Sequence, residues 1–357
     1  MKGFVGWWSM RAQAGGVFAF GASTLIAFAP ALQTLDKPVT YAVSDLGPLP
    51  SRVDVNFQLA EDGTVVGCYR TDEGRTRAAV WRQKQRVDLE SPPGFHEGIA
   101  TGMTESGEIV GFVFDASDDR KRHAVLWRSG KPEFLDAEKS LNVDNGENTV
   151  ALGASRKIVV GQSQTSDGKA EAVFWRNGVR AALGVLEKGD SSAATDVNER
   201  GNIVGYSNLV PHGKNRAFLR ENGKMTELQP ISGGDTAQAR ALNNIGQAVG
   251  WSDASGEGLH ATLWRNGKPV DLGTLGDEPS AAYDIADNGD IVGGSSVNER
   301  TYHAFLHRNG KMIDLNSLLP KDSGWTLRQA QSINNRREIV GIGSHNRERR
   351  AFLLTPQ

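Results

Sequence analysis

The feature that most constrains this chain is a Val-Gly pair that recurs seven times. The glycines stand at positions 67, 111, 161, 205, 250, 293 and 341, so successive copies are 43 to 50 residues apart. A recurring unit of this length is typical of solenoids and propellers, in which one supersecondary motif is repeated. The repeat therefore restricts the architecture before any single residue is considered. We interpret each glycine as the end of the second strand of its copy.

One copy, residues 281–315, shows what a unit contains. Asn288-Gly289 and Asn309-Gly310 each separate two short apolar segments, which is the strongest short-range indication of a β-hairpin. Two hairpins give four strands, and this favours a propeller because propeller blades are four-stranded sheets. Lys157 and Arg337 replace the first turn glycine in copies three and seven. We expect turns of a different type or length there.

The predicted third strands are apolar at successive positions, as in residues 124–127, and not at alternate ones. That pattern predicts strands buried on both faces, as they are where blades stack around an axis. Four of these strands contain a tryptophan, at positions 81, 127, 175 and 264. We interpret these tryptophans as packing between blades, with a ligand platform as the alternative.

The seventh copy has no fourth strand after residues 350–354. Residues 41–46 precede the first copy, and Asp45-Leu46-Gly47 at their end matches Asp271-Leu272-Gly273. We predict that residues 41–46 supply the outermost strand of the last blade, because this pairing closes the ring and leaves no unpaired edge. The predicted fold is all-β: a seven-bladed β-propeller of four-stranded antiparallel blades, forming a single domain over residues 41–357.

The N-terminal residues have the pattern of an export signal. Lys2 and Arg11 precede an uncharged, largely apolar span that contains Ala29-Pro30-Ala31, a small-x-small cleavage site. We predict a signal peptide over residues 1–31, a linker over 32–40 and an extracellular or periplasmic location. An uncleaved anchor, which would be the only membrane contact, and a buried apolar segment are the alternatives.

Composition excludes several classes of function. The formal net charge is −2 with both signs interspersed, so the basic field that nucleic-acid binding requires is missing. The single cysteine, Cys68, can form neither an intramolecular disulfide nor a cysteine-based zinc site, and we interpret it as a buried apolar residue. We expect a monomer without a cofactor.

Several motifs resemble one family. Asp-Leu-Gly-Thr-Leu-Gly (271–276), Asn-Gly-x-Ile-Val-Gly (288–293) and His-Ala-Phe-Leu (303–306) are similar to motifs of the HAF-type extracellular repeat family, named after His-Ala-Phe. The resemblance covers about residues 41–354, and only copy six keeps His-Ala-Phe intact. It implies a secreted or surface-associated protein, and it supplies no catalytic residues that could be transferred to this chain.

Candidate site residues lie in the loops between the predicted blades, which are longer and less regular than the hairpin turns. Function is usually found on the variable loops of a rigid scaffold. Six carboxylates are candidates for a ring at the channel mouth that binds a cation or a hydrogen-bonding ligand such as a glycan: Asp144, Asp190, Asp235, Asp277, Glu278 and Asp322. The alternative is that they are ordinary solvated loop residues.

Three histidines, His123, His260 and His303, share one position of the repeat. Equivalent positions on different blades lie about 10 Å or more apart, whereas zinc–nitrogen bonds are about 2 Å long, so these residues cannot share a metal ion. We expect each imidazole to hydrogen-bond a loop carbonyl, and we predict no metal site.

No nucleophile motif is present, and we expect a binding module more than an enzyme. The predicted function is a secreted or surface-associated protein that uses the variable-loop face for a glycan or an extracellular protein partner. A hydrolase or lyase with a polar site at the channel mouth is one alternative, and a purely structural surface protein is another. Carboxylates beside a histidine at one channel end would favour the enzyme.

Overall fold

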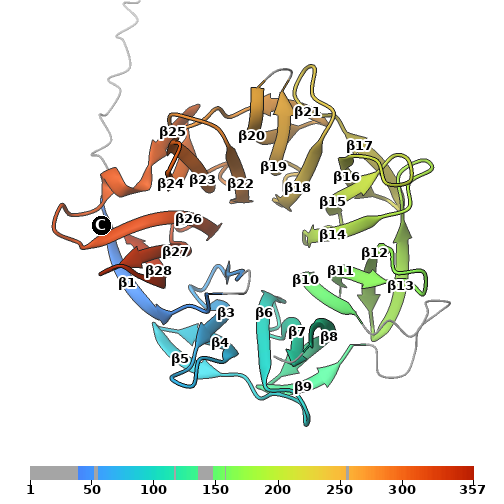
Figure 1. Ribbon diagram of the computed structural model, residues 1–357, viewed down its shortest axis with the longest axis horizontal. Coiled ribbons are helices and arrows are strands. Elements are labelled where there is room, and N and C mark those ends of the chain that lie inside the picture. Colours follow the sequence, from blue (N-terminus) through green and yellow to red (C-terminus); the bar gives the residue numbers. More distant parts are fainter. Residues whose placement is uncertain (1–38, 52–54, 116–117, 136–147, 157, 255–256) are drawn as a thin grey trace, which may run out of the picture. The chain divides into compact units, whose positions relative to one another are not determined.

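A computed structural model describes residues 39–51, 55–115, 118–135, 148–156, 158–254 and 257–357. The predicted signal peptide lies outside these residues, as does most of the predicted linker. The described residues form seven four-stranded antiparallel sheets, arranged as blades around a central channel (Figure 1). The predicted seven-bladed propeller is confirmed. Within this part of the chain, no helix is long and apolar enough to span a membrane.

The strands of the first four blades follow one another from the channel outwards. Blade one contains β2 (Gln58–Leu59), β3 (Val65–Arg70), β4 (Thr76–Arg82) and β5 (Gln85–Asp88). Blade two contains β6 (Glu97–Met103), β7 (Ile109–Asp115), β8 (Asp118–Arg128) and β9 (Lys131–Phe134). Blade three contains β10 (Thr149–Ser155), β11 (Ile158–Gln164), β12 (Ala170–Arg176) and β13 (Val179–Gly184). Blade four contains β14 (Ser192–Val197), β15 (Ile203–Asn208), β16 (Asn215–Glu221) and β17 (Lys224–Leu228).

The last three blades complete the ring. Blade five contains β18 (Ala237–Leu242), β19 (Ala248–Ala254), β20 (Glu257–Arg265) and β21 (Lys268–Asp271). Blade six contains β22 (Ser280–Ile285), β23 (Ile291–Asn298), β24 (Thr301–Arg308) and β25 (Lys311–Asp314), followed by a short 3-10 helix, η1 (Leu315–Leu318). Blade seven contains β26 (Trp325–Ile333), β27 (Ile339–His345), β28 (Glu348–Pro356) and β1 (Tyr41–Pro48).

The two ends of the propeller meet in blade seven. β1 pairs antiparallel with β28, from Tyr41 opposite Pro356 to Pro48 opposite Arg350, and the two strands lie side by side in Figure 1. Arg350 also forms an ion pair with Asp45 of β1, with Nε and Oδ2 2.7 Å apart. The predicted ring closure is confirmed, and the closing strand extends two residues beyond the predicted end at residue 46.

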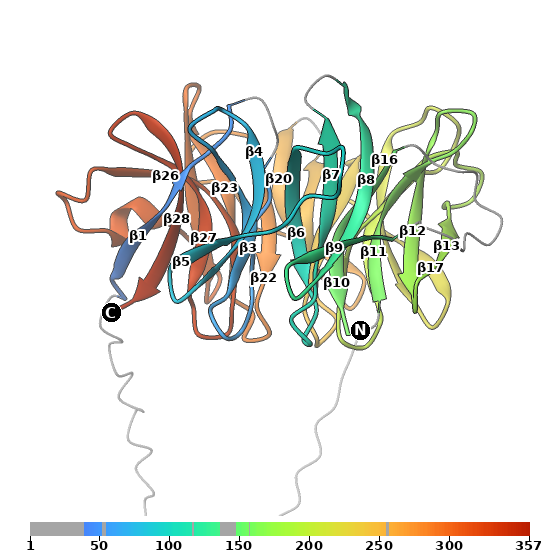
Figure 2. The ribbon, with the colours of Figure 1, turned by 90° about the horizontal axis from the view of Figure 1, so that it is seen from below.

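We call the propeller face with the turns between first and second strands, such as residues 286–290, the turn face. The opposite face, with the loops between blades such as residues 272–280, is the loop face; the two faces form the top and bottom of the ring in the side view of Figure 2. On the turn face, neighbouring blades are joined by asparagine side chains. The Nδ2 groups of Asn198 and Asn243 donate to Asn243 O (3.0 Å) and Ala286 O (3.2 Å), and Asn334 Nδ2 donates to Ala60 O (3.1 Å).

Tryptophans of the third strands hold neighbouring blades together. The indole N–H groups of Trp81, Trp127 and Trp264 donate to the carbonyl oxygens of Leu46 (3.1 Å), Glu90 (2.7 Å) and Gln229 (2.7 Å), respectively. Each acceptor lies at or just beyond the outermost strand of the preceding blade. These tryptophans and Trp175 are at most 2% exposed, so packing between blades accounts for them.

The repeated glycine lies inside the second strand, so the expectation that it ends this strand is wrong. Gly293, for example, is the third residue of β23. A Cβ on Gly293 would collide with the carbonyl oxygen of Ala281 in the innermost strand and with the ring of Phe305 in the third strand. The corresponding carbonyl would meet a Cβ in the same way at Gly111, Gly161, Gly205, Gly250 and Gly341. Close approach of two backbones explains why glycine recurs at this position in these copies.

The turn of copy seven also differs from expectation. Arg337 adopts φ +66°, and its turn has the same two backbone hydrogen bonds as the turn at Gly289. The turn type is thus retained although an arginine occupies a conformation that favours glycine. The other exceptional turn contains Lys157, which lies outside the described residues.

Candidate functional site

Six of the seven innermost strands contain a β-bulge at the same place. In blade six, the pairing of β22 with β23 shifts between Ala282 and Asp284 and leaves Tyr283 as an extra residue. The same shift occurs in β6, β10, β14, β18 and β26. The extra residues are Thr101, Leu152, Thr195, Arg240, Tyr283 and Gln331. Bulges near functional sites often redirect a side chain in this way.

All six extra residues line one hollow in the channel, with a volume of about 420 Å³. We call it the bulge hollow. Asn56, Gln329 and Arg122 of β8 also line it. Its walls come mainly from the middle of the innermost strands, which run from the loop face to the turn face. Its volume is in the range of pockets that bind small molecules.

Some polar groups of the bulge hollow are used to join blades. Thr101 Oγ1 donates to Ala151 O at 2.8 Å, and Thr195 Oγ1 donates to Ala239 O at 3.0 Å. Gln331 accepts from the backbone N–H of Phe57 at 3.0 Å and donates to a backbone carbonyl of the same segment. These three side chains fix the walls of the hollow.

Tyr283 and Arg240 are two further polar residues that line the hollow. Burial raises the pKa of Tyr283, against the opposing effects of a hydrogen bond with Tyr302 and of the positive charge of Arg240. The phenol therefore stays protonated at neutral pH and acts as a hydrogen-bonding group, not as a base. Arg240 is exposed in the channel.

A second hollow, of about 520 Å³, lies at the turn-face end of the channel. We call it the turn hollow. Carboxylates of four blades line it, but the two most enclosed ones bind neighbouring blades. Asp284 accepts from Ser332 Oγ (2.6 Å) and Ile333 N (2.9 Å), and Asp196 accepts from Leu242 N (3.0 Å).

The environment of these two carboxyl groups disfavours ionisation. Burial raises the pKa of Asp196 to about 7, although hydrogen bonds from the backbone N–H groups of Leu242 and Val197 oppose the change. The charge of Asp284 adds to the increase, and burial raises the pKa of Asp284 itself. The described residues that line the two channel hollows include no histidine, so the carboxylate–histidine arrangement that would favour an enzyme is not formed by them.

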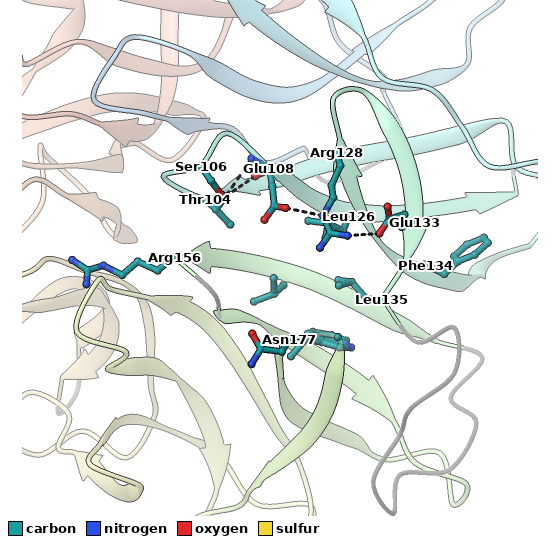
Figure 3. A pocket seen from close by; sticks show the side chains of 13 residues that line it. Thr104, Ser106, Glu108, Leu126, Arg128, Glu133, Phe134, Leu135, Arg156 and Asn177 are labelled. Atoms are coloured by element: carbon teal, nitrogen blue, oxygen red, sulfur yellow. Dashed lines mark hydrogen bonds and ion pairs between the residues drawn. The ribbon is translucent and has the colours of Figure 1, made fainter.

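A third hollow, of about 450 Å³, lies between blades two and three (Figure 3). Leu126, Leu135 and Trp175 contribute apolar walls. Arg128 contacts Glu108 (Nε to Oε1, 2.7 Å) and Glu133 (Nη1 to Oε2, 2.6 Å), as the dashed lines show. Because these charged groups pair with one another, the hollow offers fewer groups to a polar ligand than the bulge hollow does.

The three repeated histidines lie in separate blades, but their partners differ from those expected. His260 Nδ1 lies 2.9 Å from Asp271 and Nε2 lies 3.3 Å from Glu278, while His303 Nδ1 lies 2.7 Å from Asp314. The expectation of a loop carbonyl is wrong for these two residues, because the adjacent fourth strand carries an aspartate. Burial lowers the pKa of His260, but hydrogen bonds and charges of both carboxylates outweigh it, so the pKa is raised.

His123 instead packs against aromatic rings, with the ring centroids of Phe95 and Phe134 5.1 and 5.9 Å away. Among the residues that the structure describes, no three His, Cys, Asp or Glu side chains are grouped so that they could hold a metal ion.

The five predicted ligand-binding carboxylates that the structure describes line none of these three hollows. Asp144 lies outside the described residues. Asp190 accepts from Asn208 Nδ2 (2.6 Å), Asp235 pairs with Lys214 Nζ (2.7 Å), and Glu278 contacts His260. No hydrogen bond or ion pair joins Asp277 or Asp322 to another described side chain. A ligand-binding role for the six carboxylates therefore stays a prediction.

The residues of the bulge hollow were missed by reasoning from the sequence. The available indication was position: five of the six extra residues directly follow an alanine that recurs eleven residues before the repeated glycine, namely Thr101, Thr195, Arg240, Tyr283 and Gln331. Their types differ from copy to copy, so a search for repeated residues passes over them.

A closed seven-bladed β-propeller with a ligand-sized, hydrogen-bonding hollow in its channel is therefore the class of structure to which this chain belongs. No family model matches the chain, and no curated protein matches its sequence. Similar solved structures are found, and their low sequence identity means that they bear on the fold alone.

The propeller domain of the Trilobed protease from Pyrococcus furiosus matches with a TM-score of 0.51 and 9% identity, over 89% of this chain and 97% of that one. That domain is described as having an open velcro topology, whereas β1 closes the ring here. A prolyl endopeptidase matches with a TM-score of 0.55 and 10% identity, over 89% of this chain and 50% of that one. TolB from Acinetobacter baumannii matches with a TM-score of 0.48 and 13% identity, over 84% of this chain and 65% of that one. The chain thus spans less than two thirds of the last two.

Proposed function

We propose that this chain is a binding module that takes up a polar ligand, a glycan or a segment of an extracellular protein, at the bulge hollow. The observation that carries the proposal is the convergence of six bulged residues from six blades on one hollow of about 420 Å³. Three of these residues are fixed by hydrogen bonds, so the hollow is formed before a ligand arrives. A preformed site binds with a smaller loss of conformational entropy.

The hollow favours binding over catalysis. Its tyrosine stays protonated at neutral pH, and no histidine occurs among its described lining residues, so a general base is missing from this set. The hydrolase or lyase alternative predicts that a bound oligosaccharide is cleaved. Mass spectrometry of the oligosaccharide after incubation tests this, and we expect an unchanged mass.

The site can be tested by filling it. Leu152, an extra residue of β10, lines the hollow, and Leu152→Trp would place a large ring in it. Val87 of β5 is 52% exposed on the outer strand of blade one, so Val87→Trp is a matched control. The chain beginning at Leu32 would be applied to arrays of glycans and extracellular proteins. We expect Leu152→Trp to abolish binding and Val87→Trp to retain it, with both variants folded by circular dichroism.

Retention of all binding by a folded Leu152→Trp protein would contradict the proposed site. The experiment does not depend on knowing the ligand beforehand, because any partner found with the unmodified chain is then measured with the two variants. Retention of binding by both variants would point instead to the loop face.

We also propose that the protein is exported. The support is the charge pattern around Lys2 and Arg11, the uncharged apolar span that follows and the Ala29-Pro30-Ala31 site. Expression of the full chain in a bacterial host, followed by N-terminal sequencing of the periplasmic fraction, is expected to find Leu32 as the first residue. Recovery of the full chain only in the membrane fraction would favour the uncleaved anchor.

A further inference from the structure

The guanidinium of Arg240 is unusual among the charged groups of the channel. Arg240 is the extra residue of the β18 bulge, between Ala239 opposite Gly250 and Ala241 opposite Val249. It is exposed within the bulge hollow, and it forms no hydrogen bond or ion pair with any residue of the described ranges. A bulge that holds an arginine in the channel without a protein partner leaves all of its donors to a ligand.

The surroundings of Arg240 favour a negative charge. Tyr283 lies close enough for the arginine to act on its ionisation. The described lining residues include no aspartate or glutamate. A concave, partly enclosed site with charge of one sign concentrates its field, so its attraction for an oppositely charged group exceeds that of the same arginine on a convex surface.

The turn hollow has the opposite character. Its lining includes Glu61, Asp62, Glu105 and Glu199, and Arg82 is its single arginine or lysine among the described residues. The bulge hollow is therefore the positive part of the channel and the turn hollow the negative part. This distribution of charge favours an acidic group beside Arg240 over one in the turn hollow.

We propose that the ligand of the bulge hollow carries an oxyanion, the carboxylate or sulfate of an acidic glycan, and that Arg240 binds this group. This inference rests on the proposed function, because it names the class of ligand for the same site. Arginine suits the task because its planar donors form two parallel hydrogen bonds to a carboxylate or sulfate group. Tyr283, from the next blade, lines the same hollow.

The test compares glycans that differ in charge. The probes are an oligogalacturonate, its neutral methyl ester and a sulfated galactan oligomer, and calorimetry measures their Kd with the chain beginning at Leu32. The variants are Arg240→Gln, which removes the charge, and Arg240→Lys, which keeps it without the two parallel bonds. Arg265→Gln is the matched control, because Arg265 is an exposed arginine of the same blade that lines none of the hollows.

We expect at least one acidic probe to bind about tenfold or more tightly than the methyl ester, which corresponds to about 1.4 kcal/mol. Arg240→Gln should remove this preference, Arg240→Lys should keep part of it, and Arg265→Gln should leave it unchanged. Raising the salt concentration should weaken the binding of the acidic probe and leave the binding of the methyl ester unchanged. Preference for the carboxylate or the sulfate probe identifies the source of the oxyanion.

Two results would overturn the inference in different ways. Equal binding of acidic and neutral probes, unaffected by Arg240→Gln but lost in Leu152→Trp, would show that the hollow binds a ligand without selecting charge. The proposed function would then stand. If neither acidic probe binds the unmodified chain, the inference that the ligand is an acidic glycan is rejected. The proposed function fails by a different result, namely that the Leu152→Trp protein still binds every ligand of the unmodified chain.

Discussion

Asp196 is expected to make the stability of the propeller depend on pH in the opposite direction to that of an ion-paired carboxylate. Burial raises its pKa to about 7 in the folded chain, whereas an aspartate of an unfolded chain titrates near 3.9. Between about pH 4 and pH 7 the folded state therefore binds more protons at this site than the unfolded state does. The free energy of unfolding falls as pH rises through that window.

The difference of about three pKa units, at about 1.4 kcal/mol each, sets the size of the effect. Complete deprotonation of Asp196 would lower the free energy of unfolding by at most about 4 kcal/mol between pH 4 and pH 8. The value is an upper bound because part of the side chain meets the water of the turn hollow, which screens its charge. Even half of it is a large share of the net stability of a typical domain.

Asp196→Asn isolates this contribution. Urea unfolding, followed by tryptophan fluorescence, would be measured for both proteins from pH 4 to pH 8, so that all other titrating groups cancel in the difference. Asn offers a single acceptor oxygen, and the variant is expected to be the less stable protein at pH 4 because the backbone N–H of Leu242 or Val197 loses its acceptor. Its relative stability should rise by up to about 4 kcal/mol by pH 8.

Glu199→Gln is the control, because Glu199 is an exposed carboxylate of the same turn. A difference between Asp196→Asn and the unmodified protein that stays constant from pH 4 to pH 8 would refute the reasoning. It would mean that the Asp196 carboxyl is solvated as well in the folded ring as in the unfolded chain.

Three further predictions concern the packing of the ring. A chain that begins at residue 49 lacks β1 and the acceptor of Trp81, and its Tm should fall well below that of the chain beginning at Leu32; equal Tm values would mean that closure adds no stability. Trp127→Phe should lower the free energy of unfolding by about 1–3 kcal/mol because the Glu90 carbonyl loses its donor. Trp325→Phe, which removes no such bond, is the control, and comparable losses in urea unfolding would contradict the role of the indole N–H. Cys68 is buried and its pKa is raised to about 12, so a thiol reagent should label it only in urea; rapid labelling of the folded protein would be inconsistent with that burial.

The architecture could be predicted because propeller geometry imposes the same requirements on every blade. The turn glycines and the apolar third strands recur from copy to copy, and the fourth strand is missing only from copy seven. They led to the number of blades and to the pairing of β1 with β28. The prediction that the glycine of the Val-Gly pair ends the second strand was wrong, because sequence periodicity shows where glycine recurs and not which backbone atom approaches it.

The candidate site could not be predicted by the same reasoning. The residues at the bulge positions differ: threonine, leucine, arginine, tyrosine and glutamine occupy one structural position, so no single residue type marks it in the sequence. These residues line one hollow because of a shift in strand register, and no residue type in the sequence predicts that shift. The partners of His260 and His303 were missed for a related reason, since pairing across β20–β21 and β24–β25 brings the aspartates to them.

The bulges also separate the identity of a side chain that lines the channel from the strand pairing that holds its blade together. An extra residue has no direct partner across the strand pair, so the pairing of the sheet does not depend on which side chain it carries. Positions 152, 240 and 283 can then be exchanged in combination while the blades keep their register. The ring is thus a scaffold in which the lining of the bulge hollow can be varied by a small combinatorial library at these positions.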